Sequence, residues 1–223
     1  GATLDVMTSQ PPELPDLVFT ANAAAIVQRR AFLSWFAKPE RQAEHVLFGD
    51  ALRKAGCNVD LHFVDARIPF EGAGDALLLE GAGLVLGWGF RTEHAAADAL
   101  VQRLHGLRVR AVRLGNPHFY HLDTCFCPLS DGSALWYPDA FGPDDRRVLS
   151  GLLGPSRGIA VTADEANEFA CNAVEAEGRV FAHRWSVRLQ RILAARGFEA
   201  IATDLSEFIK AGGAAKCLTL RLD

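Results

Sequence analysis

Apolar and polar positions recur along this chain in one repeated pattern. Residues at helical spacing end at a glycine, a short strand follows, and a polar loop leads into a second apolar strand. In the clearest copy the helix covers 40–55 and stops at Gly56, and strands are predicted over 59–64 and 76–79. The polar loop between these two strands is 71–75. Each copy therefore predicts one strand-and-helix unit.

Four further copies are predicted. One has a helix that begins at Thr92, a predicted N-cap, followed by a strand over 109–114 and a loop over 118–123. The next copy contains helix 145–153, strand 159–161, loop 164–168 and strand 169–174. The copy after it contains helix 187–196, strand 200–202 and a final strand over 218–222. A fainter copy at the start has a strand over 2–7 and no helix.

The glycines that end these units are spaced at a near-constant period. They are separated by 55, 50, 52 and 39 residues and are Gly1, Gly56, Gly106, Gly158 and Gly197. Five such units favour an α/β fold in which strands and helices form a closed ring with five-fold pseudo-symmetry. No linker rich in Pro, Gly or Ser interrupts the period. We therefore expect a single domain over 1–223, whose first unit lacks an N-terminal strand and helix.

The composition is that of an ordinary globular protein. Of the 223 residues, 49% are apolar and 22% are charged, which is enough apolar material for a sizeable core. A net charge of −4 without a basic run provides no electrostatic surface for nucleic acid. No apolar run reaches the roughly 18 residues that a membrane helix needs. Five cysteines and no apolar leader favour free thiols in a reducing compartment, so we expect a cytoplasmic location.

Equivalent loops of a repeated ring lie at one end of it, and here those loops carry reactive side chains. They contribute a nucleophile, a base and several acidic groups, namely Asp16, Asn22, Glu71, Asp75, His121, Asp123, the 167–172 region and Cys217. Thiolate is the most nucleophilic form that a side chain offers near neutral pH, and histidine is the most frequent general acid or base. The acidic side chains favour a cationic substrate.

Cys217 is the candidate nucleophile because it follows the pair Gly212-Gly213 where a loop enters the predicted last strand. A thiol in this position would be held by a strand and approached from an open loop. Position alone leaves a buried structural cysteine as an equal alternative, since free cysteines are commonly buried. Taken singly, the acidic residues fit solvated loops or turns as well.

A non-enzymatic alternative comes from a cluster of metal-binding residue types. His118, His121, Cys125 and Cys127 could bind zinc in a structural module, although a C-x-C pair is tighter than the usual ligand spacing. A second alternative is a catalytically inactive scaffold. The intact Cys217, His121 and Glu71 argue against a scaffold.

Five ordered motifs resemble the guanidine-modifying superfamily, which includes arginine deiminases, dimethylargininases and amidinotransferases. They span nearly the whole chain and lie at 14–23, 70–75, 89–93, 119–128 and 211–217, the last being a Gly-Gly-x-x-x-Cys motif. The chain is most similar to the arginine dihydrolase branch, because Thr20-Ala21-Asn22 has Asn where deiminases and dimethylargininases have Asp. The resemblance implies a five-fold α/β propeller, called a pentein, and agrees with the ring expected from the repeats.

The resemblance also implies a role for each site residue. Cys217 matches the nucleophile and His121 the general acid/base, with Glu71 as a third catalytic residue. The residues that would bind substrate are Asn22, Asp75 and Asp123 around the guanidinium group and Arg41 and Arg91 at the substrate carboxylate. Without the resemblance, the solvated face of a helix is the preferred interpretation of Arg41. No cofactor and no metal are implied.

The implied reaction is hydrolysis of the guanidino group of arginine through a covalent amidino-cysteine intermediate. A dihydrolase would give ornithine, ammonia and carbon dioxide, whereas a dimethylargininase or arginine deiminase would give citrulline. Asn22 bears on this choice because a neutral amide both donates and accepts hydrogen bonds, while a carboxylate only accepts. The expected partner is a small molecule, arginine or a methylated arginine, and not nucleic acid or a membrane. The sequence leaves formation of a homo-oligomer open.

Overall fold

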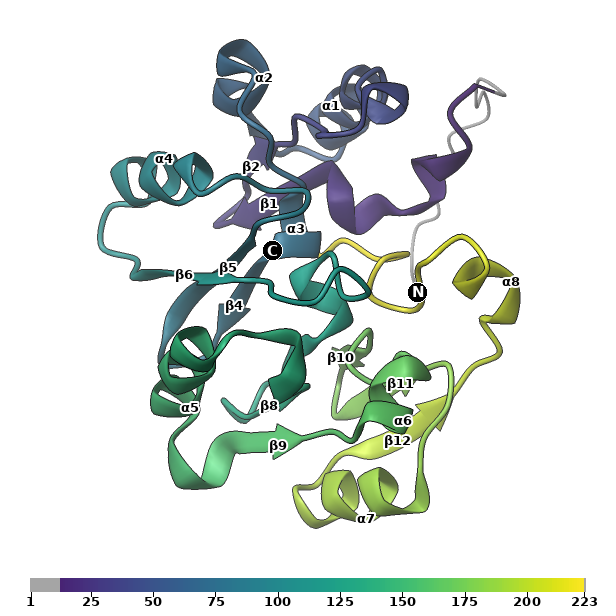
Figure 1. Ribbon diagram of the computed structural model, residues 1–223. Helices are drawn as coiled ribbons and strands as arrows, with labels where there is room; N and C mark the ends of the chain where they lie inside the picture. Colours follow the sequence, from purple (N-terminus) through teal and green to yellow (C-terminus); the bar gives the residue numbers. More distant parts are fainter. Residues whose placement is uncertain (1–12, 223) are drawn as a thin grey trace.

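The computed structural model describes residues 13–222 and has an α/β architecture built from four three-stranded sheets (Figure 1). In each sheet the first two strands form an antiparallel hairpin. The third strand pairs with the second in parallel, after a helical connection. A parallel neighbour requires such a crossover, which explains the helix in every unit.

The four units have closely similar element orders. The first contains β1 Ala24–Val27, β2 Arg30–Leu33, α1 Glu44–Lys54 and β3 Asn58–Asp60, and the second β4 Ala76–Leu79, β5 Gly83–Trp88, α4 Ala95–Arg103 and β6 Val109–Arg113. The third contains β7 Phe126–Pro128, β8 Ala134–Trp136, α5 Pro143–Arg157 and β9 Gly158–Ala160, and the fourth β10 Val174–Ala176, β11 Arg179–Ala182, α7 Val187–Ala195 and β12 Glu199–Ala202. The sequence repeat is therefore a structural repeat.

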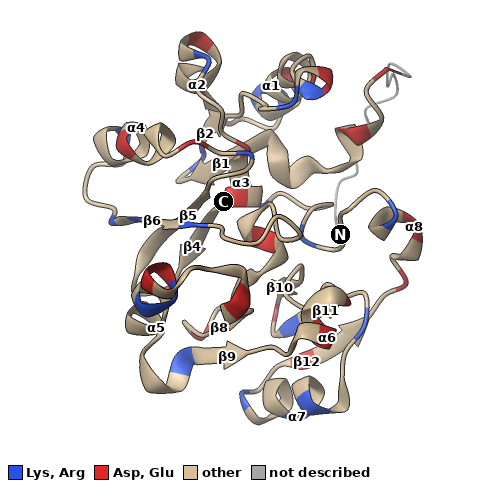
Figure 2. Cartoon of the chain, viewed as in Figure 1, with Lys and Arg blue, Asp and Glu red and all other residues tan. Residues whose placement is uncertain are grey.

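Short helices occur both between the units and within them. They are the α-helices α2 His62–Ala66, α3 Gly72–Asp75, α6 Ala163–Asn167 and α8 Ser206–Ile209, and the 3-10 turns Pro15–Val18, Thr20–Ala23, Pro39–Arg41, Leu122–Thr124 and Pro138–Ala140. The long helices α1, α4, α5 and α7 lie at the periphery, with the strands on their inner side (Figure 1). Both signs of charge occur on α1 and α5, whereas acidic α3 lies near the centre (Figure 2). No helix in the described part of the chain is long and apolar enough to span a membrane.

Helix α7 shows how sequence fixes one of these units. The Ser186 side chain accepts a hydrogen bond from the backbone N–H of Leu189 and so caps the helix. Leu189 and Leu193, four residues apart, are both buried against the core. Gly197 follows the helix with a φ of +85°, which favours glycine and ends the helix as predicted.

The other predicted stop glycines have mixed outcomes. Gly56 and Gly106 have φ values of +79° and +84° and follow helices as predicted. Gly158 directly follows α5 as predicted, but its backbone is extended and it also begins β9. Helix α5 is already interrupted at Gly154, which has a φ of +62°. Gly1 and the strand predicted over 2–7 lie outside the described residues.

Several predicted elements differ from the structure. The strand predicted over 59–64 ends at Asp60, and helix α2 begins at His62. The Asp60 side chain accepts a hydrogen bond from the backbone N–H of His62 and so favours the start of the helix. Thr92 is not an N-cap; its hydroxyl turns inward to Asp75. The loop predicted over 164–168 is largely helix α6, and the strand predicted over 169–174 begins only at Val174.

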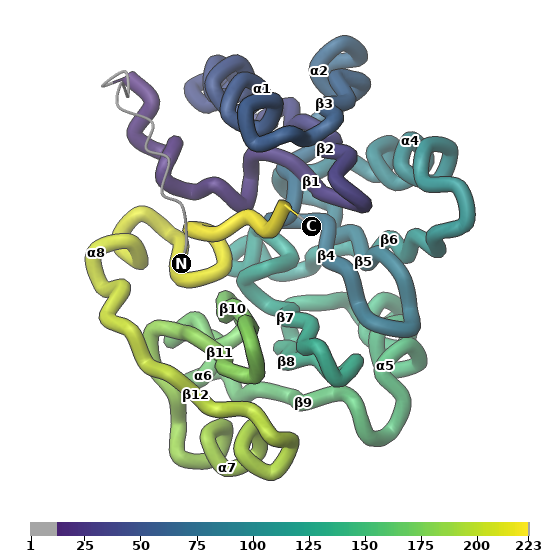
Figure 3. The backbone as a smooth tube through the Cα atoms, turned by 180° about the vertical axis from the view of Figure 1, so that it is seen from behind, coloured from purple at the N-terminus to yellow at the C-terminus, as the bar shows by residue number. Residues whose placement is uncertain are grey.

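The strand predicted over 218–222 is also absent. Leu218 and Thr219 bond back to Ala214 and Lys216 in a helical turn, and no strand among residues 13–222 pairs with this segment. A strand needs a ladder partner, which alternation alone does not supply. The C-terminal segment instead lies between the first and last units, seen in yellow in Figure 3. It bonds to Ala21 on one side and Asn172 on the other.

Candidate active site

The predicted site residues come from equivalent places in the repeat. Each lies in the segment that leads into the first strand of a unit: Asn22 before β1, Glu71 before β4, His121 and Asp123 before β7, and Asn172 before β10. Cys217 lies in the corresponding C-terminal segment. The structure brings these segments together, through hydrogen bonds that join residues 42 to 94 positions apart.

His121 and Glu71 form the centre of the polar network. The Nε2 atom of His121 lies 2.7 Å from Oε2 of Glu71, and both side chains are buried. Burial alone would lower the pKa of His121, but the nearby carboxylates of Asp75, Glu71 and Asp123 raise it above its ordinary value. Burial would raise the pKa of Glu71, but hydrogen bonding and charge from His121 keep it below its ordinary value. The pair therefore favours an imidazolium beside a carboxylate.

Cys217 is held by two residues from other segments. Its Sγ lies 3.1 Å from Nδ2 of Asn172 and 3.4 Å from Oδ2 of Asp123. Burial and the neighbouring Asp123 charge raise the pKa of the Cys217 thiol well above its ordinary value. The raised pKa favours the neutral thiol, whose S–H donates to Asp123.

Asn172 is a site residue that the sequence indicated only as part of the 167–172 region. Its Oδ1 accepts from the backbone N–H groups of Ala214 and Cys217, at 3.0 and 3.3 Å, and its Nδ2 donates to the Asp123 carbonyl and to Cys217. The side chain thus fixes the loop that carries the thiol. Its place before β10, equivalent to that of His121 before β7, was the available signal.

The glycine pair ahead of Cys217 is required by close approaches. Gly212 has a φ of +90°, and its carbonyl accepts from the Tyr120 hydroxyl at 3.1 Å. A Cβ on Gly213 would lie 2.5 Å from the Phe19 ring and 3.0 Å from the Cβ of Cys217. The backbone freedom predicted for these glycines fits this geometry, although the loop that carries Cys217 leads into a helical turn and not into a strand.

A small pocket of about 60 Å³ lies over the thiol. It is lined by Asp16, Phe19, Asn22, Arg41, Arg91, Tyr120, His121, Cys217 and residues 211–213. Glu71, Asp75 and Asp123 lie behind this lining and are fully buried. A larger cavity of about 790 Å³, between β4, β7, β10 and the C-terminal segment, contains none of the predicted site residues.

Asp75 supports the site from behind. Its Oδ1 accepts from the N–H of Leu122 at 2.9 Å and its Oδ2 from the Thr92 hydroxyl at 2.7 Å. Burial raises its pKa to about 7, against the lowering effect of His121 and the hydrogen bonds. The Thr92 hydroxyl also accepts from the N–H of Glu71 at 3.0 Å. Asp75 therefore connects the Glu71 and His121 segments.

The two predicted arginines have different surroundings. The Arg41 guanidinium is buried and pairs with Glu44 through Nε at 2.9 Å and an Nη at 2.8 Å, while its other Nη donates to Asn22 Oδ1 at 3.2 Å. Arg91 lies over the Tyr120 ring at 4.7 Å and 3.5 Å from Glu71 Oε2. Arg91 has its guanidinium fork freer for an incoming carboxylate, whereas the fork of Arg41 already holds Glu44.

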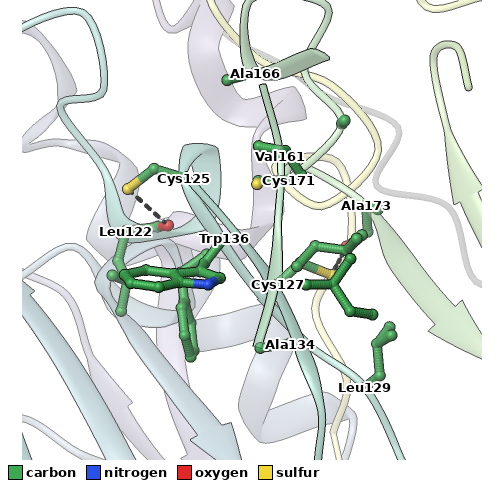
Figure 4. Close-up of a cluster of buried hydrophobic side chains, with 14 of the residues drawn as sticks. Leu122, Cys125, Cys127, Leu129, Ala134, Trp136, Val161, Ala166, Cys171 and Ala173 are labelled. Atoms are coloured by element: carbon green, nitrogen blue, oxygen red, sulfur yellow. Dashed lines mark hydrogen bonds between the residues drawn. The ribbon is translucent and has the colours of Figure 1, made fainter. Parts of the chain in front are cut away.

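The proposed zinc ligands do not converge. His121 bonds to Glu71, the Cys125 thiol points to the Leu122 carbonyl at 3.5 Å, and the Cys127 thiol points to the Ala173 carbonyl at 3.4 Å. Both cysteines belong to the apolar core around Trp136 (Figure 4). Among residues 13–222 no group of three or more His, Cys, Asp or Glu side chains is arranged to hold a metal.

The sequence model described as N,N dimethylarginine dimethylhydrolase, eukaryotic, matches residues 1–222. The chain belongs to the dimethylarginine dimethylhydrolase family. A family relative, the N(G),N(G)-dimethylarginine dimethylaminohydrolase of Mycobacterium tuberculosis, is 36% identical over 94% of this chain and 67% of its own length. The predicted membership in the guanidine-modifying superfamily is confirmed.

Two further relatives are similar to the chain at higher identity. The bifunctional arginine dihydrolase/ornithine cyclodeaminase AgrE of Nostoc sp. is 43% identical over 99% of the chain. The solved N-terminal domain of ArgZ bound to substrate, an arginine dihydrolase from the ornithine-ammonia cycle in Cyanobacteria, has a TM-score of 0.89 at 41% identity and covers 96% of this chain and 78% of that one. The chain spans about a third of the length of AgrE, 31%.

Proposed function

We propose that this chain is a hydrolase that acts on the guanidino group of arginine through a covalent amidino-cysteine intermediate and gives ornithine, ammonia and carbon dioxide. The observation that carries the proposal is the pocket in which Cys217, His121 and Asn22 meet, backed by the carboxylates of Glu71 and Asp123. The similarity to relatives named as arginine dihydrolases supports the same reaction.

The first step needs a sulfur anion beside a cation. The Cys217 thiol has a raised pKa by itself, and a guanidinium within about 4 to 6 Å would favour its thiolate form. Substrate binding therefore releases the thiol proton to solvent and generates the nucleophile. The buried carboxylates keep the guanidinium charged. The thiolate attacks the guanidinium carbon, and His121 gives its proton to the departing nitrogen, which leaves as ammonia.

The second step frees the enzyme. Water attacks the amidino-cysteine carbon while His121, now neutral, takes a proton from it, and the carbon–sulfur bond breaks. The product of this half is a ureido group, as in citrulline. His121 is suited to both directions because Glu71 accepts its Nε2–H and stabilises the imidazolium that forms.

Asn22 is proposed to permit a second round of hydrolysis on the ureido group. Its amide lines the pocket and, being neutral, can donate to the ureido oxygen as well as accept from nitrogen. The second round consumes another water and releases ornithine, a second ammonia and carbon dioxide. Arg91 is proposed to bind the substrate carboxylate, with Arg41 contributing its one remaining N–H.

We also infer that the four sheets and the Cys217 segment together form a five-fold pseudo-symmetric ring, the pentein fold, as a single domain. Support comes from the equivalent placement of all five site-bearing segments. A small molecule is the proposed partner.

A citrulline-forming activity is the second candidate, favoured by the description of the family that the sequence matches. Incubation with arginine, dimethylarginine and agmatine in turn, followed by product analysis, tests the proposal. Ornithine from arginine is the expected result. Citrulline alone would replace the dihydrolase by a deiminase or dimethylargininase.

A further inference from the structure

Glu44 is a buried acidic residue to which the reaction above gives no role. It is fully buried at the start of α1 and pairs with Arg41, whose side chain is only 6% exposed. Its two oxygens accept from Nε and one Nη of Arg41 at 2.9 and 2.8 Å, a bidentate arrangement. Burying two charges costs free energy that such a pair only partly recovers, so a buried pair beside a pocket calls for an explanation.

Arg41 also contacts two residues of the pocket lining, Asp16 and Asn22. The Nη that holds Glu44 also donates to the Asp16 carbonyl at 3.3 Å, and the Asp16 carboxylate lies 3.7 Å from Nε. The remaining Nη of Arg41 donates to Asn22 Oδ1 at 3.2 Å, and Nδ2 of Asn22 donates to the Glu71 carbonyl at 3.4 Å. These two partners require opposite ends of the amide. A flipped amide would place its NH2 against the guanidinium and its oxygen against a carbonyl, so the observed orientation is favoured.

The backbone around Asn22 also limits its movement. A Cβ on Gly74 would lie 2.3 Å from Nδ2 of Asn22, so the amide nitrogen packs directly on the glycine. Asn22 is 2% exposed and lines the pocket. With Oδ1 held by Arg41 and one Nδ2 hydrogen held by Glu71, a hydrogen of Nδ2 is left for a ligand.

We infer that Glu44 is a positioning residue, which holds Arg41 so that Asn22 presents an N–H to the pocket. This inference rests on the proposed function. The donor matters little for a guanidinium, which has no acceptor, but it matters for the ureido product, whose oxygen accepts. Glu44 therefore controls how much of the ureido intermediate is hydrolysed to ornithine before it escapes as citrulline.

The test is the ornithine-to-citrulline ratio from arginine in Glu44→Gln, measured on the full chain. A glutamine cannot accept from both Arg41 nitrogens, so Arg41 and Asn22 are released. Losing a hydrogen bond to a charged group is expected to lower the ratio about tenfold. Glu44→Asp is the second variant, for use if Glu44→Gln folds poorly. It keeps the charge but is too short to reach both nitrogens, so it should also lower the ratio.

Glu165→Gln is the matched control. Glu165 also holds an arginine, Arg188, through both oxygens, but it lies in α6 and outside the pocket lining. This variant should lose stability while keeping the parental product ratio. If Glu44 only stabilises the fold, Glu44→Gln should, like Glu165→Gln, lose stability and keep the parental product ratio.

A double variant tests whether Glu44 acts through Asn22. The substitution Asn22→Asp introduces a carboxylate whose two oxygens are equivalent, so there is no amide orientation left to fix, and adding Glu44→Gln should not change the ratio further. A parental ratio in both Glu44 variants would overturn the inference while leaving the proposed function intact. Citrulline as the sole product of the parent would overturn both.

Discussion

The Nε2 atom of His121 and the Oε2 atom of Glu71 lie 2.7 Å apart in a buried site, although the residues are 50 positions apart in sequence. The contact joins the segments before β4 and β7, and Asp75 ties the same two segments together from behind. The geometry sets both the protonation and the orientation of the imidazole. In the proposed mechanism, the acid/base step therefore depends on Glu71 as well as on His121.

Glu71→Gln should lower the pKa of His121, because one of the carboxylates that raises it is removed. Imidazolium would then be lost at lower pH, and the decline of kcat/KM on the alkaline side should begin at lower pH than in the parent. We also expect a loss of activity of about 10²- to 10⁴-fold, the usual size of a general acid/base contribution. A pH–rate profile and an NMR titration of His121 would show both effects. An unchanged His121 titration would contradict this assignment.

Cys217→Ser should retain the fold and abolish turnover, because a hydroxyl is a far weaker nucleophile than a thiolate at neutral pH. Turnover within tenfold of the parent would remove Cys217 from the mechanism.

Cys125 and Cys171 have thiol pKa values raised well above the ordinary range by burial, as Cys217 does. A guanidinium ligand should therefore accelerate alkylation of Cys217 alone, as peptide mapping would show.

Glu165→Gln should destabilise the protein at neutral pH. Burial would raise the pKa of Glu165, but hydrogen bonds from Arg188 and Ser186 lower it to about 2. A lowered pKa stabilises the folded state above the ordinary value near 4.5, and this stabilisation disappears as pH falls toward 2. The expected loss is on the order of 2 kcal/mol, since Arg188 is partly exposed and the pairing is screened. Urea unfolding should show that the parent has a higher free energy of unfolding than the variant at pH 7, and that this difference disappears by about pH 2. A difference that does not change with pH would contradict the charge-based explanation.

Asn22→Asp should shift the products of arginine from ornithine toward citrulline. A carboxylate pairs well with the guanidinium but cannot donate to a ureido oxygen. If Asn22 only shapes its turn, the product ratio would stay constant while the rate fell. Chromatography of the two amino acids at several conversions distinguishes these outcomes.

Much of the fold could be predicted from sequence, because helix spacing and strand alternation are local signals. Helix α7 and strand β4 agree closely with their predicted ranges. Failures occur where a tertiary contact overrides the local pattern. Thr92 is a residue type that commonly caps helices, yet its hydroxyl donates to Asp75 and accepts from the backbone N–H of Glu71. The apolar alternation over 218–222 needed a partner strand that the sequence could not show.

The site was predicted in the same uneven way. Repetition and the family resemblance together indicated His121 and Cys217, and the structure places both in the lining of one pocket. Neither signal showed that Asn172 would hold Cys217 or that Glu44 would occupy the fork of Arg41. Those contacts depend on how side chains from separate units meet, which no spacing along the chain records.

The most direct test of the central claim is the fate of arginine in the purified chain. Isotopically labelled arginine should yield ornithine, carbon dioxide and two equivalents of ammonia per substrate, as the two-step hydrolysis requires. Cys217→Ser serves as the blank. Quantitative conversion to citrulline with a single equivalent of ammonia would contradict the dihydrolase account.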